Sequence, residues 1–300
     1  NNINPDNVNT FPTPSAEAAA PLGTYGSVAT PDTNCFAYGQ ASLPVRVELA
    51  NGSYLTSMFG YGLSYNTLDN NKAPTSGVYV SFGQDFAGAG GDVAYLRSTA
   101  DMRSYYEVVT DLVSIVHLQA GDMIGLSKCP TGECSSSDGY VRMLDDFKMG
   151  PNLVRGFQPA GIGPRDITPG TTGDNIGGTM YWGASLEYQY PFYFLPKDTG
   201  FRGAVFVDSG SVWGYKGETQ NPATGEVNGS ITTLVTAPPT TFVCQCGMQY
   251  ADDASLRASV GASIIWDSPF GPLRFDFAYP FLKKWYDRTQ FFAFGGGAQF

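Results

Sequence analysis

Long hydrophobic runs are missing from this sequence. No stretch of about 18 consecutive apolar residues occurs, which excludes a membrane-spanning helix. Basic residues are also few, with 17 Lys and Arg against 27 Asp and Glu and a net charge of −10 at pH 7, which argues against nucleic acid as a partner. A transmembrane β-barrel is compatible with both absences, because its strands alternate apolar with polar residues.

Histidine and cysteine are scarce. The one histidine, His117, lies in a strand-like run, and nothing near it in the sequence suggests a placed nucleophile or carboxylate partner, so we predict no enzymatic activity and no cofactor. Of the five cysteines, Cys129 and Cys134 bracket a short polar segment, which favours a disulfide over a metal site. The pairing of the other three stays open, and the odd total leaves at least one free thiol: Cys35, Cys244 and Cys246.

What the sequence does contain is an alternation of apolar and polar residues with a period of two. In PLRFDFAYPF, residues 272–281, Leu273, Phe275 and Phe277 point one way while Arg274 and Asp276 point the other. The same pattern predicts an all-β fold of nine strands, each long enough to cross a bilayer at a tilt. The predicted strands are 53–66, 76–86, 92–106, 111–124, 180–194, 201–214, 255–267, 272–283 and 290–300.

The connections between these strands alternate in length. Short links fall near 67–75, 107–110, 195–200 and 268–271, whereas the links near 125–179 and 215–254 are long. Short turns at one end and long loops at the other are typical of an antiparallel up-and-down barrel of the outer membrane.

The composition of the two strand faces suggests which one meets lipid. Aromatic residues gather near strand ends, as at Tyr105–Tyr106 and in the run from Tyr188 to Phe194, which resembles a membrane-interface girdle. We therefore expect the apolar faces to contact lipid and the charged faces to line the lumen. The expected lumen charges are Arg97, Asp101, Arg103, Glu187, Arg202, Asp208, Arg257, Arg274 and Asp276.

An odd number of strands does not suit a complete bacterial barrel. Residues 1–52 are polar and rich in proline, which predicts a long extracellular loop rather than a first strand. Because the chain also starts at Asn1 and not at methionine, we expect residues 53–300 to be the C-terminal part of a larger barrel.

The segment LVRGFQPAGIGPRD, residues 153–166, lies in the longest expected loop. Together with GGTMYWGASLEYQYPFYF, RGAVFVDSGSVW and WDSPFGPLRFDFAYPF, it resembles the BamA family of outer-membrane insertases in order and spacing. The resemblance covers residues 53–300 and implies the last nine strands of a barrel of about sixteen, preceded by periplasmic POTRA domains.

The resemblance also implies where the motif Val154-Arg155-Gly156-Phe157 lies. In the family this loop folds into the lumen, where its arginine meets acidic residues of the wall; the matching residues are Glu187 and Asp208, with Phe206 packed beside the guanidinium. A buried arginine needs such carboxylates, and Gly156 permits a tight turn. Without the resemblance, an exposed loop arginine would be the simpler interpretation.

The closing segment FFAFGGGAQF resembles the last strand of that family. Gly295, Gly296 and Gly297 would weaken its pairing with the first strand and allow a lateral gate, while the terminal Phe300 resembles the recognition signal of the family's substrates. A plain glycine-rich closing strand is the alternative.

The function implied by the resemblance is the folding and insertion of β-barrel proteins into the outer membrane of a Gram-negative bacterium. The expected partners are the lipid bilayer, unfolded barrel proteins and accessory Bam lipoproteins bound through the periplasmic domains. Three alternatives are open: a related POTRA-barrel transporter for autotransporter assembly or two-partner secretion, a passive porin, and an outer-membrane enzyme, for which the sequence offers no catalytic constellation.

Overall fold

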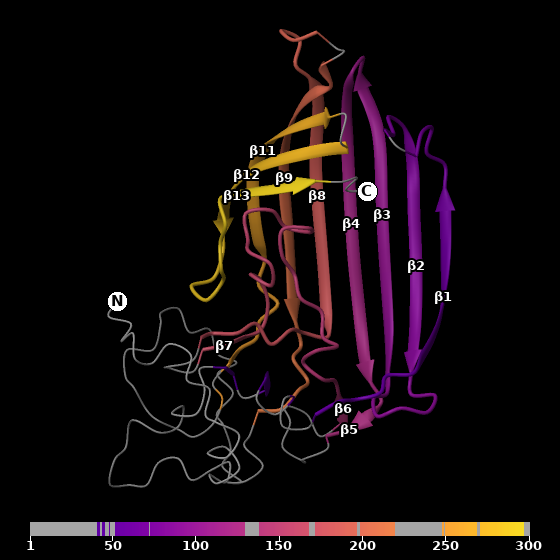
Figure 1. Cartoon of the computed structure of the whole chain (residues 1–300), viewed down its shortest axis with the longest axis vertical. Helices are drawn as coiled ribbons and strands as arrows, with labels where there is room; N and C mark the ends of the chain where they lie inside the picture. Colours follow the sequence, from indigo (N-terminus) through magenta and orange to yellow (C-terminus); the bar gives the residue numbers. More distant parts are fainter. Residues whose placement is uncertain are drawn as a thin grey trace, which may run out of the picture.

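The structure is a computed structural model that describes most of the strand-forming part of the chain. The described residues are 52–71, 73–129, 138–167, 172–196, 199–219, 250–268 and 271–296, with 41, 42, 44, 45, 48 and 248. Over these ranges the chain forms one antiparallel sheet of nine strands in the order β1-β2-β3-β4-β8-β9-β11-β12-β13 (Figure 1). The predicted all-β antiparallel fold is therefore confirmed, and in the described ranges no helix is long and apolar enough to cross a bilayer.

The nine strands follow the alternating segments of the sequence. Two pairs of very short strands, β5 (Ser127–Lys128) with β6 (Asp138–Tyr140) and β7 (Arg165–Asp166) with β10 (Tyr250–Ala251), lie in the long connections. The long strands are β1 (Met58–Asn66), β2 (Gly77–Ala87), β3 (Tyr95–Val109), β4 (Leu112–Gly125), β8 (Met180–Pro191), β9 (Phe201–Trp213), β11 (Arg257–Ser268), β12 (Gly271–Leu282) and β13 (Phe292–Gly296).

Several strand boundaries differ from the expected ones by a few residues, and two of these differences have a visible local reason. The strand expected from residue 53 begins at Met58, because Leu55 and Ser57 accept backbone hydrogen bonds from the loop residues Asp92 and Gly88. The strand expected to reach residue 194 ends at Pro191, after which the Leu195 amide donates to the Phe192 carbonyl in a turn. The last strand is described up to Gly296, and the predicted residues 297–300 lie outside the described residues.

The two faces of the sheet differ sharply in exposure. On β9, Val205 and Val207 are 44% and 47% exposed, while their neighbours Phe206 and Asp208 on the other face are 2% and 1% exposed. We call the face that carries Asp208 the inner face and the opposite one the outer face. Apolar side chains on the outer face thus remain uncovered by protein, which is the arrangement expected of strands that contact lipid.

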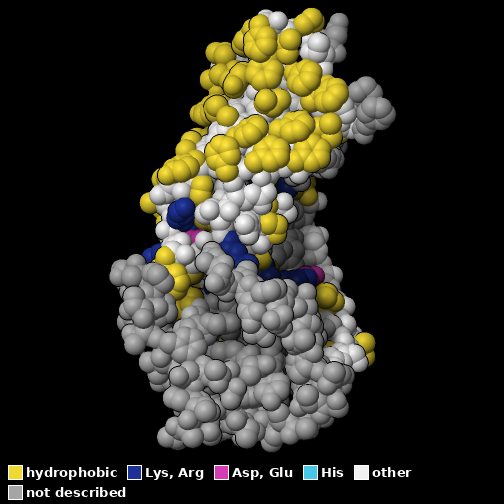
Figure 2. All heavy atoms as spheres, turned by 60° about the vertical axis from the view of Figure 1, so that its left-hand side comes forward, with side chains coloured by type: hydrophobic (Ala, Val, Ile, Leu, Met, Phe, Trp, Pro, Cys, Tyr) yellow, Lys and Arg dark blue, Asp and Glu magenta, His cyan; other side chains and the backbone are white. Residues whose placement is uncertain are grey.

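Hydrophobic side chains cover a broad area of the outer surface in Figure 2. Over β11, β12 and β13 the exposed members include Val260, Ile264, Phe277, Tyr279, Phe281, Phe292 and Phe294. A water-soluble sheet would not leave such a continuous apolar area open. The exposure supports the orientation predicted from the sequence, with the apolar faces toward lipid.

The sheet curls along its length. Strands β1 to β4 run close to the long axis of the molecule, whereas β11 to β13 lie steeply across it (Figure 1). This rotation follows the right-handed twist that accumulates from strand to strand. Because of the curl, side chains on the inner face of β8 and β12 come within reach of each other although β9 and β11 separate them in the sheet.

Candidate functional site

The described residues 147–167 and 172–178 of the long connection lie against the inner face of the sheet. Phe147 forms an antiparallel bridge with Gly178, and Met149 forms one with Ile162, so the segment closes on itself. The amides of Leu153 and Val154 both donate to the Gly150 carbonyl, at 3.1 and 3.0 Å. This compact turn presents the next four residues, Val154 to Phe157, to the wall.

Two apolar residues of the motif anchor the loop. Val154 and Phe157 are fully buried and belong to one hydrophobic cluster with Met149, Ile162 and Val212 of β9. Burying each such side chain contributes about 1.5–3 kcal/mol. The loop is therefore held on the inner face by packing as well as by charge.

Gly156 occupies a position that a larger residue fits poorly. Its φ is +89°, and a Cβ there would lie 3.2 Å from the Ala278 Cβ, 3.4 Å from the Pro280 Cδ and 3.4 Å from the Ser259 Cβ. Glycine adopts this conformation without steric cost. The motif glycine thus allows the loop backbone to lie directly against β11 and β12.

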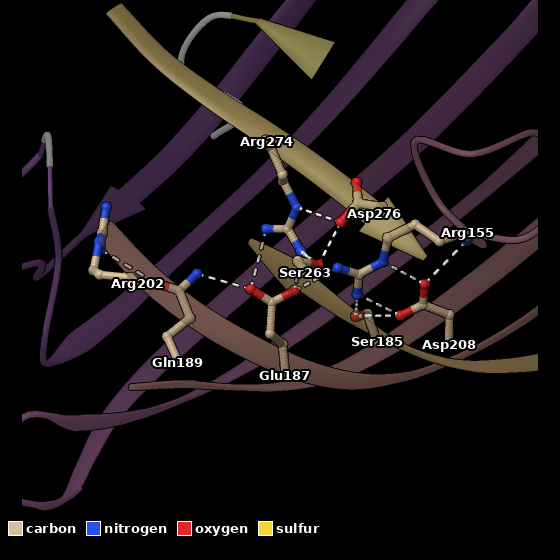
Figure 3. A network of polar contacts seen from close by, with 9 residues as sticks. All are labelled: Arg155, Ser185, Glu187, Gln189, Arg202, Asp208, Ser263, Arg274 and Asp276. Atoms are coloured by element: carbon tan, nitrogen blue, oxygen red, sulfur yellow. Dashed lines mark hydrogen bonds and ion pairs between the residues drawn. The ribbon is translucent and has the colours of Figure 1, made fainter. Parts of the chain in front are cut away.

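Arg155 is the centre of a network of buried polar contacts (Figure 3). Its Nε and Nη2 donate to the two carboxylate oxygens of Asp208, both at 2.7 Å, and its Nη1 donates to the Glu187 Oε2 at 2.5 Å. The Arg155 amide adds a bond of 3.0 Å to the Asp208 Oδ2, and Nη2 donates to the Ser185 Oγ. The fork on Asp208 is the bidentate geometry that guanidinium groups favour.

The wall residues are brought together by strand register. Ser185 and Glu187 on β8 stand opposite Asp208 and Phe206 on β9, so all four lie on the inner face in a compact square. The Arg155 guanidinium carbon lies 3.4 Å from the centroid of the Phe206 ring, a cation–π contact. The structure therefore brings together Arg155, Glu187, Phe206 and Asp208, the residues selected from the sequence.

The electrostatic environment keeps Arg155 charged. Burial by itself lowers the pKa of the Arg155 guanidinium, but the carboxylates of Asp208 and Glu187 outweigh this effect and raise the pKa above its ordinary value. The side chains of Arg155, Glu187 and Asp208 are 12%, 7% and 1% exposed. A charge pair so far from solvent is costly to break by removing one partner.

The loop is also hydrogen-bonded to the segment that leads into β13, a contact that sequence reasoning missed. The Gln158 amide donates to the Arg288 carbonyl at 3.0 Å, the Arg288 amide to the Gly161 carbonyl at 3.0 Å and the Gln290 amide to the Gly156 carbonyl at 2.9 Å. Phe157 and Thr289 form an antiparallel bridge. These bonds use backbone atoms only, so no residue type in the sequence signals them.

Arg274 was expected to face the lumen but was not predicted to belong to this site. It projects from β12, and its Nη2 lies 2.7 Å from the Glu187 Oε2, while its Nε lies 2.8 Å from the Asp276 Oδ1. The only hint in the sequence that Arg274 could belong to the site is its position on the inward face of the strand. The contact with Glu187, 87 residues earlier, follows only from the curl of the sheet.

The closing strand is described over part of its ladder with β12. β13 pairs with β12 from Phe277↔Phe292 to Leu273↔Gly296, which covers five residues of the 12-residue β12. Gly295 and Gly296 lie in this ladder, while Gly297 and Phe300 lie outside the described residues. The weakened closure and the gate stay predictions.

The remaining predicted positions either make contacts away from Arg155 or lie outside the described residues. Cys129 is disulfide-bonded, and Cys134, its expected partner, lies outside the described residues together with Cys35, Cys244 and Cys246. His117 is on the inner face of β4, with its Nε2 2.9 Å from the Asp101 Oδ2. Among the described residues no group of three or more His, Cys, Asp or Glu side chains is arranged to hold a metal ion.

Comparison with known proteins places this arrangement in a family. The model of the Omp85 superfamily domain matches residues 19–300. The outer membrane protein assembly factor BamA of Neorickettsia risticii is 30% identical over 258 residues, which cover 85% of this chain and 29% of that protein. The sorting and assembly machinery component 50 homolog of Bos taurus is 29% identical over 178 residues, covering 57% of this chain and 34% of that protein.

A solved structure supports the fold. The crystal structure of BamA from Haemophilus ducreyi lacking POTRA domains 1–3 matches with a TM-score of 0.59 at 22% identity, covering 79% of this chain and 41% of that one. The nine-stranded sheet therefore has the fold of part of a BamA barrel. The chain spans only about a third, or slightly less, of the length of the curated relatives that it matches.

Proposed function

The chain belongs to the Omp85 superfamily, and from this premise we propose that the protein folds β-barrel proteins and inserts them into an outer membrane. The assembly factor from Neorickettsia risticii, which this chain resembles at 30% identity, supports the proposal. Since the chain spans 29% of that relative, activity, substrates and partners are all proposed for the whole protein.

The observation that carries the proposal is that the loop on the inner face contacts both the strands of the wall and the segment just before the last strand. Arg155 fixes the loop to β8 and β9, while the residues from Gly156 to Gly161 pair with the backbone of 288–290 just before β13. A segment packed against the inner face narrows the open passage that a passive pore requires. A loop bonded next to the closing strand can influence the seam, which is the junction between the last and the first strand of the barrel.

The proposed mechanism is physical and involves no covalent step or cofactor. β13 lies at one end of the nine-stranded sheet, and over the described residues it pairs with β12 through five residue pairs; in a complete barrel its other side would face the first strand at the seam, and it becomes an edge when that seam opens. An edge strand presents free backbone donors and acceptors on one side, and an incoming strand of a substrate can pair with them. In lipid such pairing is strongly favoured, because unpaired backbone groups have no water to bond. We propose that the glycine-rich end at residues 295–297 makes this seam easy to open.

The finer parts of the proposal rest on the BamA relatives. We propose a complete barrel of about sixteen strands, of which these are the last nine, with POTRA domains that bind accessory Bam lipoproteins. We also propose the outer membrane of a Gram-negative bacterium as its location. The similarity to a Bos taurus protein means that family membership alone leaves the source open.

The test uses the intact protein reconstituted in lipid vesicles. A urea-unfolded β-barrel protein is added, and its folding is followed by protease protection over time. We expect the vesicles with protein to speed folding at least tenfold over empty vesicles, and Arg155→Ala to remove most of that gain. A matched control is Arg97→Gln, which breaks a 2.8 Å ion pair with Asp85 on the inner face and removes none of the Arg155 contacts. Equal folding rates with and without the protein would refute the proposed function.

A further inference from the structure

Two arginines share one carboxylate at the loop site. Glu187 Oε2 accepts from Arg155 Nη1 of the loop at 2.5 Å and from Arg274 Nη2 of β12 at 2.7 Å. Arg274 Nη1 also donates to the Glu187 Oε1, at 3.1 Å. Figure 3 shows the two guanidinium groups next to each other at the Glu187 carboxylate.

Arg274 is itself held in place. Its Nε donates to the Asp276 Oδ1 at 2.8 Å, and its Nη2 donates to the Ser263 Oγ at 2.8 Å. Ser263 in turn donates to the Asp276 Oδ1. Because these partners lie on β11 and β12, the orientation of Arg274 does not depend on the loop.

The two wall carboxylates are therefore unequal. Glu187 keeps Arg274 as a cationic partner whether or not the loop is present. Asp208 bonds to Arg155 through three nitrogen atoms and to Ser185, and among the described residues Arg155 is its only cationic partner. Withdrawal of the loop would strand Asp208 but leave Glu187 neutralised.

The shared carboxylate also weakens the hold on the loop. The two guanidinium groups repel each other across Glu187, and Glu187 divides its charge between them. Without Arg274, Arg155 would face two otherwise unpaired carboxylates and would be held more tightly. With Arg274 present, the guanidinium of Arg155 is held mainly by Asp208.

We propose that Arg274 is a positioning residue that presents Glu187 to the loop and keeps it neutralised when the loop leaves. In doing so it ties β12 to β8 across the inner face in both situations. The consequence for insertion rests on the proposed function, in which the loop controls the seam. The sharing of Glu187 by the two arginines would make it easier for the loop to leave the inner face. The contact between Arg274 and Glu187 would meanwhile keep β12, the strand that pairs with β13, in place.

The test is a mutant cycle on the intact protein in lipid vesicles, with the equilibrium constant of unfolding measured in urea. Arg155→Ala is compared in the wild-type and in the Arg274→Gln background. We expect it to shift the equilibrium at least tenfold more, about 1.4 kcal/mol, when Arg274 is absent, since it then strands both carboxylates. The excess should vanish when Glu187→Gln is added, because no carboxylate is then left to strand at that position.

Controls separate positioning from simple stabilisation. Arg274→Lys retains the positive charge and should behave like the wild type in the cycle, which also covers the case that Arg274→Gln fails to fold. Arg97→Gln, on the inner face but paired with Asp85, should add to Arg155→Ala without any excess. Additive costs of Arg155→Ala and Arg274→Gln would overturn the proposal.

The insertion assay is run in parallel on the same variants. An absent excess in the cycle, with wild-type insertion intact, would refute the role of Arg274 and leave the proposed function standing. An excess in the cycle without any insertion by the wild type would refute the proposed function and leave the positioning role standing.

Discussion

Removal of the loop arginine should leave a buried carboxylate without its cationic partner and destabilise the protein. Removal of that carboxylate's charge should restore part of the lost stability. Arg155→Ala eliminates every hydrogen bond that the guanidinium makes to Asp208, Glu187 and Ser185. Asp208, whose side chain is 1% exposed, then keeps only Ser185 and the Arg155 backbone amide. Asp208 would then lack a cationic partner in a site with little access to water.

The magnitude follows from the environment of each carboxylate. Breaking a buried ion pair from one side costs about 3–5 kcal/mol. Glu187 retains Arg274, so the lower end, about 3 kcal/mol, is expected for Arg155→Ala. Asp208→Asn in that background keeps the shape and removes the stranded charge, and should recover about 1–2 kcal/mol.

The assay is urea unfolding of the intact protein in lipid vesicles, followed by the fluorescence of its tryptophans, four of which lie in this chain. The dependence of the unfolding free energy on urea concentration should stay constant across the variants, which would show that they unfold to the same extent. Asp208→Asn alone serves as the control and should itself be destabilising, because it weakens the fork with Arg155. A double variant no more stable than Arg155→Ala would show that Asp208 is solvated or neutral, and would refute the reasoning.

Three further predictions concern other parts of the molecule. Gly156→Ala should destabilise the protein by about 1–3 kcal/mol in the same urea assay, because the φ of Gly156 is +89° and three side-chain atoms lie within 3.4 Å of the added Cβ. A loss of stability below about 0.5 kcal/mol would contradict the close approach of the loop backbone to β11 and β12. Burial and the nearby Glu48 raise the pKa of Glu218 from 4.5 to about 7. Because the folded state retains the proton to higher pH than the unfolded state, the unfolding free energy should fall as the pH rises between these two values. Glu218→Gln should abolish this pH dependence, and an unchanged pH dependence in that variant would exclude Glu218 as its source. Val207→Arg on the outer face should reduce the free energy gained on folding into vesicles by about 2–4 kcal/mol, whereas Thr99→Arg on the inner face should reduce it far less. Equal reductions would contradict the assigned orientation of the two faces.

The strands could be located from the sequence alone because a β-strand places successive side chains on opposite faces. In β9 the alternation of Val205 and Val207 with Phe206 and Asp208 is visible in the letters and reappears as exposed and buried residues. The boundaries were less certain. The early end at Pro191 and the late start at Met58 depend on hydrogen bonds to neighbouring loops, which alternation does not encode.

The candidate site was predictable in part, and only with the help of a resemblance. Arg155 lies 53 residues from Asp208 and 32 from Glu187, so neither periodicity nor local spacing could pair them. The motif residues were selected because ordered segments around them resembled a known family. Arg274 and the segment 288–290 had no such guide, and both were missed as members of the site.

The amino-acid sequence is sufficient to predict long antiparallel strands with one apolar and one polar face, because side-chain alternation is a local property of extended backbone. Which charges meet depends on how the strands and the loop are arranged in three dimensions. The curl of the sheet brings Arg274 of β12 to Glu187 of β8, and the loop delivers Arg155 between Glu187 and Asp208. Such contacts depend on accumulated twist and on a loop that folds back inside, and neither is written in any short stretch of residues.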